Sequence, residues 1–172
     1  MGSEDNNSGG FLKVLLLLFT LVASSHVLGH GGEDHSKKVK NTKINTANEK
    51  TQEKYIKINR DYIKTVKPLF QKSCFDCHGN STDYPWYYTI PGVKQLIDSD
   101  IKEAKKHLDF SNDFPFKSHE TPIKDLDAIN KSIKNDVMPP FRYLIMHGDK
   151  KLTKDELNQV ENWIRESKEI LK

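Results

Sequence analysis

The chain has 172 residues, 35% of them hydrophobic and 30% charged, which is typical of one soluble domain with some additional chain. Its 27 basic and 24 acidic residues give a net charge of +3 at pH 7, too balanced to indicate a nucleic-acid-binding protein. Two cysteines cannot form a disulfide framework, and only one segment is apolar enough to enter a bilayer, which excludes a multi-span membrane protein.

Residues 1–29 predict a signal peptide or an N-terminal anchor. Lys13 precedes an almost continuous apolar run over residues 14–23, and small residues follow it, as they do at signal-cleavage sites. The first ten residues are atypical of a signal peptide, because they carry Glu4 and Asp5 and no basic residue. We therefore expect an exported, periplasmic protein, either released by cleavage or held at the inner membrane by an uncleaved segment.

Residues 30–57 show no apolar periodicity and are rich in lysine. Such a composition buries too little apolar surface to offset the entropy lost on ordering. The sequence predicts a disordered basic tether over residues 30–57, followed by a folded domain over residues 58–172.

The first part of that domain predicts two helices. Pro68 suits the first turn of a helix that runs into Cys74, since the N–H group that proline lacks is not needed there. A second helix opens at Pro91. Its apolar residues recur every three or four positions, as on one face of a helix: Val93, Leu96, Ile97, Ile101, Ala104 and Leu108.

Two further helices follow, and no segment alternates with the period of a strand, so the fold class is all-α with about four helices. The third helix has Thr121 as N-cap and Pro122 at its first position, and it must end before Pro139. The fourth begins at the capping box of Thr153 and Glu156.

Aromatic residues and prolines are concentrated in two predicted loops, residues 78–90 and 138–152. One interpretation is that these loops wrap a flat, apolar ligand, which would supply buried surface that a small helical domain lacks. The alternative is that the aromatic side chains only fill the core.

The motif Cys74-Phe75-Asp76-Cys77-His78 is the C-x-x-C-H signature of covalent haem attachment. Two thiols on one turn can each form a thioether with a haem vinyl group, and the adjacent imidazole can bind the iron. A thioredoxin-type disulfide would require a βαβ setting, and a structural zinc site would require further ligands; the sequence provides neither. We therefore predict one covalently attached haem c.

A low-spin haem needs a sixth ligand, and Met138 is our choice, because Pro139 and Pro140 stiffen the chain beside it. A thioether ligand raises the reduction potential relative to a second imidazole. Met146 and His147 in the same loop are rivals, and an open sixth position is a further alternative.

Several motifs resemble the bacterial haem-binding domain family of single-haem c-type cytochromes. They lie within residues 62–166: Val66-Lys67-Pro68-Leu69-Phe70, Ser73–His78, Tyr84-Pro85-Trp86-Tyr87, Leu108-Asp109-Phe110-Ser111, and Met138-Pro139-Pro140 through Tyr143 to Met146-His147. The sequence departs from the family pattern at Gly79, where serine is usual, and at Ala104, where glycine is common.

The resemblance implies a cytochrome-c-like all-α domain wrapped around one covalent haem, with export before the haem is attached. It further implies that Cys74 and Cys77 carry the thioethers, that His78 is the proximal ligand, and that Met138 is the distal ligand.

The predicted function is that of an exported monohaem electron carrier rather than an enzyme, acting as a monomer with redox proteins as partners. Its haem-pocket walls are expected to include Tyr84, Trp86, Tyr87 and Phe141. Lysines near the haem edge could steer an acidic partner, although ordinary surface lysines are the simpler interpretation: Lys72, Lys94 and Lys134. The alternative function is a five-coordinate haem enzyme or sensor that reduces peroxide or binds a small gas.

Overall fold

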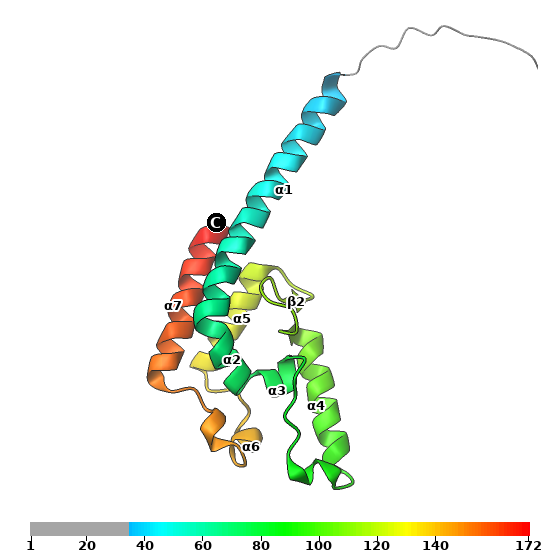
Figure 1. Cartoon of the computed structure of the whole chain (residues 1–172), viewed down its shortest axis with the longest axis vertical. Coiled ribbons are helices and arrows are strands. Elements are labelled where there is room, and N and C mark those ends of the chain that lie inside the picture. Colours follow the sequence, from blue (N-terminus) through cyan, green and yellow to red (C-terminus); the bar gives the residue numbers. More distant parts are fainter. Residues whose placement is uncertain (1–34) are drawn as a thin grey trace, which may run out of the picture. The chain divides into compact units, whose positions relative to one another are not determined.

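The computed structural model describes residues 35–172, with side chains from residue 46 onward, and it confirms an all-α fold. Figure 1 shows α1 (His35–Asp61), the π-helical turn η1 (Tyr62–Val66), α2 (Lys67–Ser73), α3 (Phe75–His78), the 3-10 turn η2 (Trp86–Thr89), α4 (Val93–His107), α5 (Pro122–Lys134), α6 (Phe141–Leu144), the 3-10 turn η3 (Gly148–Lys150) and α7 (Lys154–Leu171). Two short strands, β1 (Leu108–Asp109) and β2 (Lys117–Ser118), pair antiparallel. The four predicted helices correspond to α2, α4, α5 and α7.

The expected export segment, residues 1–29, lies outside the described residues. Within residues 35–172, no helix is both long and apolar enough to cross a membrane.

Helix α1 corrects the prediction of a disordered tether over residues 30–57, because the described part of that stretch is helical from His35 onward. The end of α1 is anchored in the domain: Ile58 is fully buried, and the ring of Tyr55 meets Phe114 edge-on at 5.9 Å. The Lys54 Nζ atom also donates to the carbonyl oxygen of Leu171, at 3.4 Å. A few well-packed residues at one end thus support a helix whose composition alone indicated disorder.

The chain continues from α1 into α2 through a π-helical turn. Pro68, near the start of α2 as predicted, has no N–H to donate within the helix. In the turn before it, the Lys67 N–H bonds to the Tyr62 carbonyl five residues back. Tyr62 and Val66 both lie buried on the core side of this turn.

The later helices begin close to the predicted residues. Helix α4 starts after Gly92, whose φ of 87° favours glycine. Helix α7 starts at the predicted capping box, in which Thr153 Oγ1 accepts from the Glu156 N–H and the Glu156 carboxylate accepts from the Thr153 N–H. Helix α5 has Thr121 at its N-cap position without a side-chain cap bond, and it ends at Lys134.

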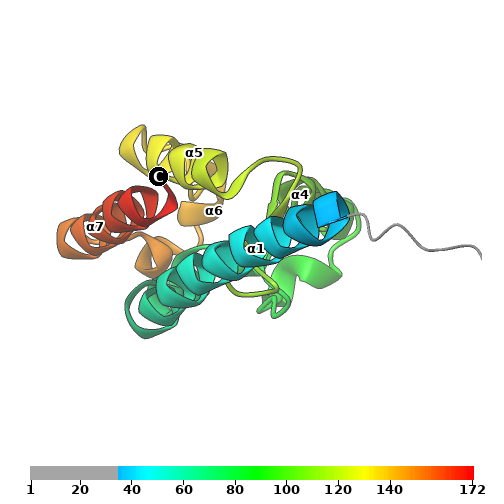
Figure 2. The ribbon, with the colours of Figure 1, turned by 90° about the horizontal axis from the view of Figure 1, so that it is seen from above.

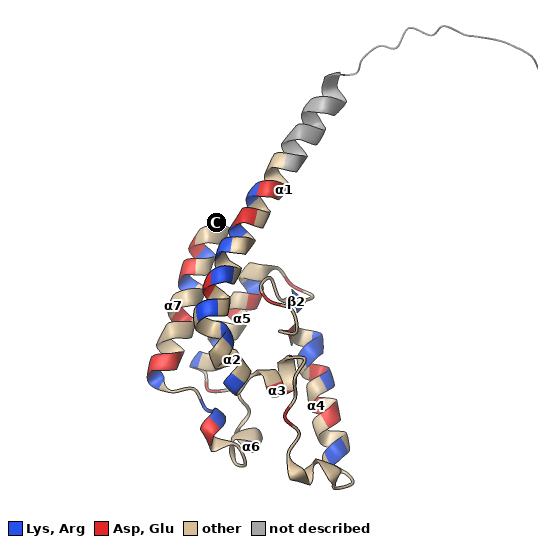
Figure 3. Cartoon of the chain, viewed as in Figure 1, with Lys and Arg blue, Asp and Glu red and all other residues tan. Residues whose placement is uncertain are grey.

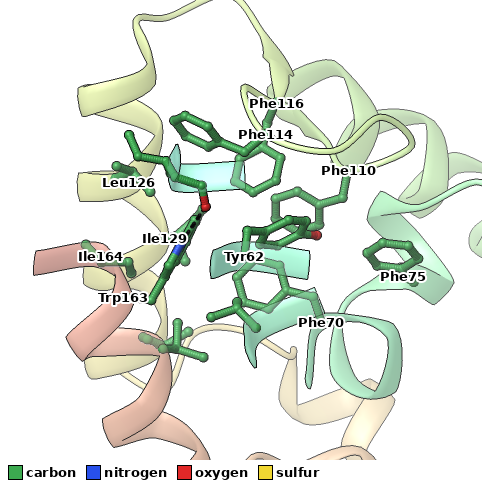
Figure 4. Close-up of a cluster of buried hydrophobic side chains, with 14 residues drawn as sticks. Tyr62, Phe70, Phe75, Phe110, Phe114, Phe116, Leu126, Ile129, Trp163 and Ile164 are labelled. Carbon is green, nitrogen blue, oxygen red and sulfur yellow. Dashed lines mark hydrogen bonds between the residues drawn. The ribbon is translucent and has the colours of Figure 1, made fainter. Parts of the chain in front are cut away.

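An aromatic cluster forms the core (Figure 4). Tyr62 lies at its centre, with its ring centroid 5.2 Å from Phe116 and 5.4 Å from Trp163. The indole N–H of Trp163 donates to the carbonyl oxygen of Ile58, which joins α7 to α1. The cluster extends to Phe110, which lies 4.9 Å from Phe70 by ring centroids. The core therefore reaches from α7 to the turn that carries the cysteines.

Helices α5 and α7 pack side by side (Figures 1 and 2), and α4 packs against α3 on the other side of the domain. Charged residues are spread over α1, α4 and α7 (Figure 3). By contrast, residues 79–93 and 137–147 contain only Asp83 and Arg142 as charged residues. These two weakly charged segments border the site described next.

Candidate functional site

The two cysteines lie on a single turn between α2 and α3. Cys74 ends α2, with its N–H bonded to the Phe70 carbonyl, and its own carbonyl accepts from Cys77 at 3.2 Å and His78 at 2.9 Å. Both thiols are free and half-buried. Burial raises the pKa of Cys74 to about 12 and raises that of Cys77 above its ordinary value. The site thus presents two protonated thiols on the same turn.

The imidazole of His78 is oriented by the backbone of the segment that follows α4. Its Nδ1 atom lies 2.7 Å from the carbonyl oxygen of Leu108, so Nδ1 carries the proton and donates, which leaves the lone pair of Nε2 free. The Phe110 N–H bonds in turn to the carbonyl oxygen of His78, at 2.8 Å. Burial lowers the pKa of His78, which favours the neutral ring. A neutral imidazole with its second nitrogen bonded to a carbonyl is the usual arrangement of a metal-binding histidine.

Exposed apolar side chains gather in the two weakly charged segments. Among residues 46–172, eight of the eleven exposed large hydrophobic side chains fall there: Tyr84, Trp86, Ile90, Val137, Met138, Phe141, Ile145 and Met146. Helix α4 has an apolar face at helical spacing, yet none of its residues is fully buried. Apolar surface of this extent is unusual in a monomer unless it binds something.

Polar contacts join these two segments to each other and to the cysteine turn. The Tyr143 hydroxyl donates to the Asp76 carboxylate, and the Tyr87 hydroxyl lies 3.5 Å from Nε2 of His147. Arg142 pairs with Asp100 of α4 at 2.7 Å. In Figure 1, α6 and the chain before α4 accordingly lie at the same end of the domain.

The predicted site residues fall into two groups in the structure. Cys74, Cys77 and His78 are brought together on one turn, whereas the predicted pocket residues lie on the segments around it. Trp86 and Phe141 are 78% and 79% exposed. Tyr87 is half-buried, and the ring of Tyr84 packs against Tyr88 rather than against the cysteine turn, with ring centroids 4.2 Å apart and planes inclined by 40°.

The three candidates for the sixth ligand differ in what they already contact. Both ring nitrogens of His147 face protein atoms, since Nδ1 lies 3.1 Å from the Tyr143 carbonyl and Nε2 faces Tyr87. Met138 and Met146 are 40% and 57% exposed. Because both ring nitrogens of His147 already have contacts within the protein, the sulfur atoms of Met138 and Met146 are the less engaged candidates for the sixth ligand.

Sequence reasoning missed Asp76, Tyr143 and the Leu108 carbonyl as parts of the site. Asp76 lay inside the attachment motif, and Tyr143 lay between the prolines and Met146, but neither position alone indicated that they would meet. The carbonyl of Leu108 left no signal in the sequence, because any residue supplies that group.

The three predicted steering lysines all have carboxylate neighbours. Lys72 lies 2.6 Å from Glu156, Lys94 lies 2.7 Å from Asp98, and Lys134 lies 3.6 Å from Glu161. Their charges are therefore paired at the surface, in keeping with the simpler interpretation.

These residues fit a haem. Two thiols and an imidazole with a free Nε2 lie on one turn, and apolar side chains border it, as a flat, largely apolar porphyrin requires. Among the residues with described side chains, no group of three or more His, Cys, Asp or Glu side chains could hold a bare metal ion.

Comparison with known families agrees with this chemistry, since residues 36–166 match the model of the haem-binding domain. The chain belongs to the haem-binding domain family. The match includes nearly all of α1, which places that helix within the domain.

This haem-binding domain is also similar to a characterised protein. It is 34% identical over 103 residues to cytochrome c peroxidase Ccp of Escherichia coli (strain K12), which is 59% of this chain and 22% of that protein. The chain thus spans about a fifth of the length of this relative. No solved structure matches the chain.

Proposed function

We propose that this haem-binding domain is a c-type cytochrome that carries one haem, bound covalently through Cys74 and Cys77, and that it transfers single electrons. The observation that carries the proposal is the turn itself: two free thiols three residues apart, followed directly by His78 with Nε2 free. When bound, the haem supplies an iron that alternates between the ferrous and ferric states.

In this proposal His78 is the proximal ligand and Met138 the distal one. The hydrogen bond from Nδ1 of His78 to the Leu108 carbonyl orients the ring, so Nε2 would be the atom that binds the haem iron. Support for a methionine comes from His147, whose ring nitrogens both face other groups of the protein. We favour Met138 over Met146 because Pro139 and Pro140 restrict the backbone beside it.

The aromatic residues around the cysteine turn are proposed to exclude water from the haem. Trp86, Tyr87, Phe141 and Tyr84 would form walls of the haem pocket, which accounts for their location on weakly charged segments. A dry, apolar environment favours the less charged ferrous state and so raises the potential.

Export, a single haem and a monomeric state complete the proposal. The apolar segment over residues 14–23 supports export to the periplasm, by a cleaved signal or an uncleaved anchor. The intact mass of the purified protein distinguishes these two forms and reports the number of haems. Gel filtration tests the monomeric state, and its physiological partners are proposed to be other redox proteins.

A second candidate function is peroxide reduction at a five-coordinate haem. The observation in its favour is the similarity to a protein named cytochrome c peroxidase, although that similarity covers only 22% of the relative. The carrier is preferred because two methionine side chains lie on the weakly charged segment that Tyr143 joins to the cysteine turn.

The visible spectrum of the oxidised protein separates the two candidates. Low-spin bands with the weak long-wavelength band of sulfur ligation are expected, and they should disappear in Met138→Ala while the haem stays covalently bound. The matched controls Met146→Ala and His147→Ala should keep both features. High-spin bands in the parent protein, together with rapid peroxide turnover, would instead establish the peroxidase.

A further inference from the structure

We propose that Asp76 is a positioning residue that fastens residues 138–152 to the haem-attachment turn and so keeps the distal ligand in place. The proposal rests on the function proposed above, because it takes the distal ligand from this loop. Asp76 lies between the two cysteines, in one of the motif's variable positions, so haem attachment does not itself require a carboxylate there.

Asp76 receives contacts from two different loops. Its Oδ1 atom accepts from the Asp83 N–H at 3.0 Å, and its Oδ2 atom accepts from the Tyr143 hydroxyl. The Nζ atom of Lys150 lies 3.7 Å from the same Oδ2, and the backbone carbonyl accepts from the Thr82 hydroxyl. The Asp76 side chain is only 15% exposed, so these contacts are partly shielded from water. Hydrogen bonds to an ionised, shielded acceptor are among the stronger ones in proteins.

The contacts continue from Tyr143 across the loop. The Tyr143 ring stacks on His147 with centroids 4.3 Å apart and planes inclined by 14°. The far side of His147 meets the Tyr87 hydroxyl on η2. The Asp76 carboxylate therefore connects, through two stacked rings, the three segments around the site: α3, the loop of α6, and η2.

Between Met138, whose N–H bonds to the Ser132 carbonyl, and the buried Leu152, the loop has few other means of holding its position. Helix α6 is four residues long and has no fully buried residue, and Phe141, Ile145 and Met146 are exposed. The other side-chain link of α6, between Arg142 and Asp100, lies at the surface, where ion pairs contribute little. Tyr143 thus supplies the main attachment, five positions after Met138 and three before Met146.

Removal of the Tyr143 hydroxyl tests this assignment. Tyr143→Phe keeps the ring that stacks on His147 and deletes only the bond to Asp76. Tyr88→Phe is the matched control, because the Tyr88 hydroxyl also donates to a carboxylate, Asp98, at 2.7 Å, but on the exposed surface. Asp76→Asn is the second variant, since it removes the charge and retains an acceptor oxygen.

Two measurements on the full-length protein with its haem are compared between these variants. The first is the rate at which carbon monoxide binds to the ferrous protein, which is limited by departure of the distal ligand. We expect it to rise about tenfold in Tyr143→Phe and to stay at the parent value in Tyr88→Phe, as the loss of one charge-assisted bond predicts. Asp76→Asn should give a smaller rise. The second is amide hydrogen exchange of residues 138–147, which should accelerate in Tyr143→Phe alone of the two tyrosine variants.

Unchanged carbon monoxide binding and unchanged exchange in Tyr143→Phe would overturn the proposal, as would equal changes in both tyrosine variants. If the proposed electron-carrier function is wrong, the measurements should give a different result. If the parent protein already binds carbon monoxide as fast as a five-coordinate haem, the distal methionine is wrong, and the exchange measurement alone then decides the role of Asp76.

Discussion

The ring of Phe75 fills the space beside Gly79: a β-carbon at position 79 would lie 2.6 Å from both Cγ and Cδ2 of that ring. Gly79 has a φ of −101°, which any residue can adopt, so the constraint is the ring rather than the backbone. Phe75 is 4% exposed and stacks on Phe110, and it cannot easily move. This contact gives a structural reason for glycine at position 79.

Gly79→Ala is therefore expected to destabilise the protein by about 1–3 kcal/mol through overpacking, measured by urea unfolding. The control is Gly148→Ala, whose new β-carbon has no neighbour within 4 Å and should cost little. The double variant Phe75→Leu with Gly79→Ala should lose less stability than the sum of the single changes. Equal costs at positions 79 and 148 would contradict the role of Phe75.

Tyr62→Phe is expected to stabilise the domain. The Tyr62 side chain is fully buried, and its hydroxyl has no hydrogen-bond partner among the described residues. Burial also raises the pKa of this phenol. Deleting an unpaired buried hydroxyl should add about 1 kcal/mol to the free energy of unfolding. Tyr143→Phe deletes a hydroxyl that does have a partner, so it should lower the free energy of unfolding. A change of the same sign in both variants would refute the argument.

Asp125→Asn should change the pH dependence of stability. Burial raises the pKa of Asp125, and Ser118 Oγ donates to this carboxylate at 2.8 Å. Because the folded-state pKa lies above the unfolded value, the parent protein loses stability as pH rises from the unfolded pKa of about 4 through the folded value. The variant should therefore be more stable than the parent at pH 7, and the difference should vanish near pH 3. Asp127→Asn, an exposed position on the same helix, serves as the control in thermal unfolding at both pH values.

Cys77→Ala is expected to leave one thioether, through Cys74, and to weaken haem retention. The intact mass after acid–acetone extraction should show a smaller fraction of protein carrying the haem than in the parent. The double change of Cys74 and Cys77 to alanine should yield colourless protein after the same extraction. A haem that resists extraction from the double variant would disprove covalent attachment through these thiols.

The helices of the domain could be predicted from the sequence because their signals are local. The capping box at Thr153 and the prolines at positions 68 and 122 each specify a start through backbone groups within a few residues. Helix α1 escaped prediction because its support is not local: Tyr55 and Ile58 rest on Phe114 and Trp163, far along the chain.

In the candidate site, too, the features with a local signal could be predicted from the sequence, and the contacts between distant residues could not. The cysteines and His78 could be identified from their spacing, since thioether chemistry fixes the order of the groups. The bond between Asp76 and Tyr143 joins residues 67 positions apart, and nothing in either neighbourhood indicates the other. The orientation of His78 depends on a backbone carbonyl at Leu108, which has no side-chain signature at all.

The pairing of Lys72, Lys94 and Lys134 with nearby carboxylates has a consequence for how the protein would meet another molecule in solution. The opposite charges of each pair lie closer together than the Debye length, which is about 8 Å at physiological ionic strength. Their electric fields therefore nearly cancel at longer range. Encounters at the apolar end of the domain should thus occur at nearly the same rate in dilute buffer and in concentrated salt, with selectivity arising from surface fit after contact rather than from attraction at a distance.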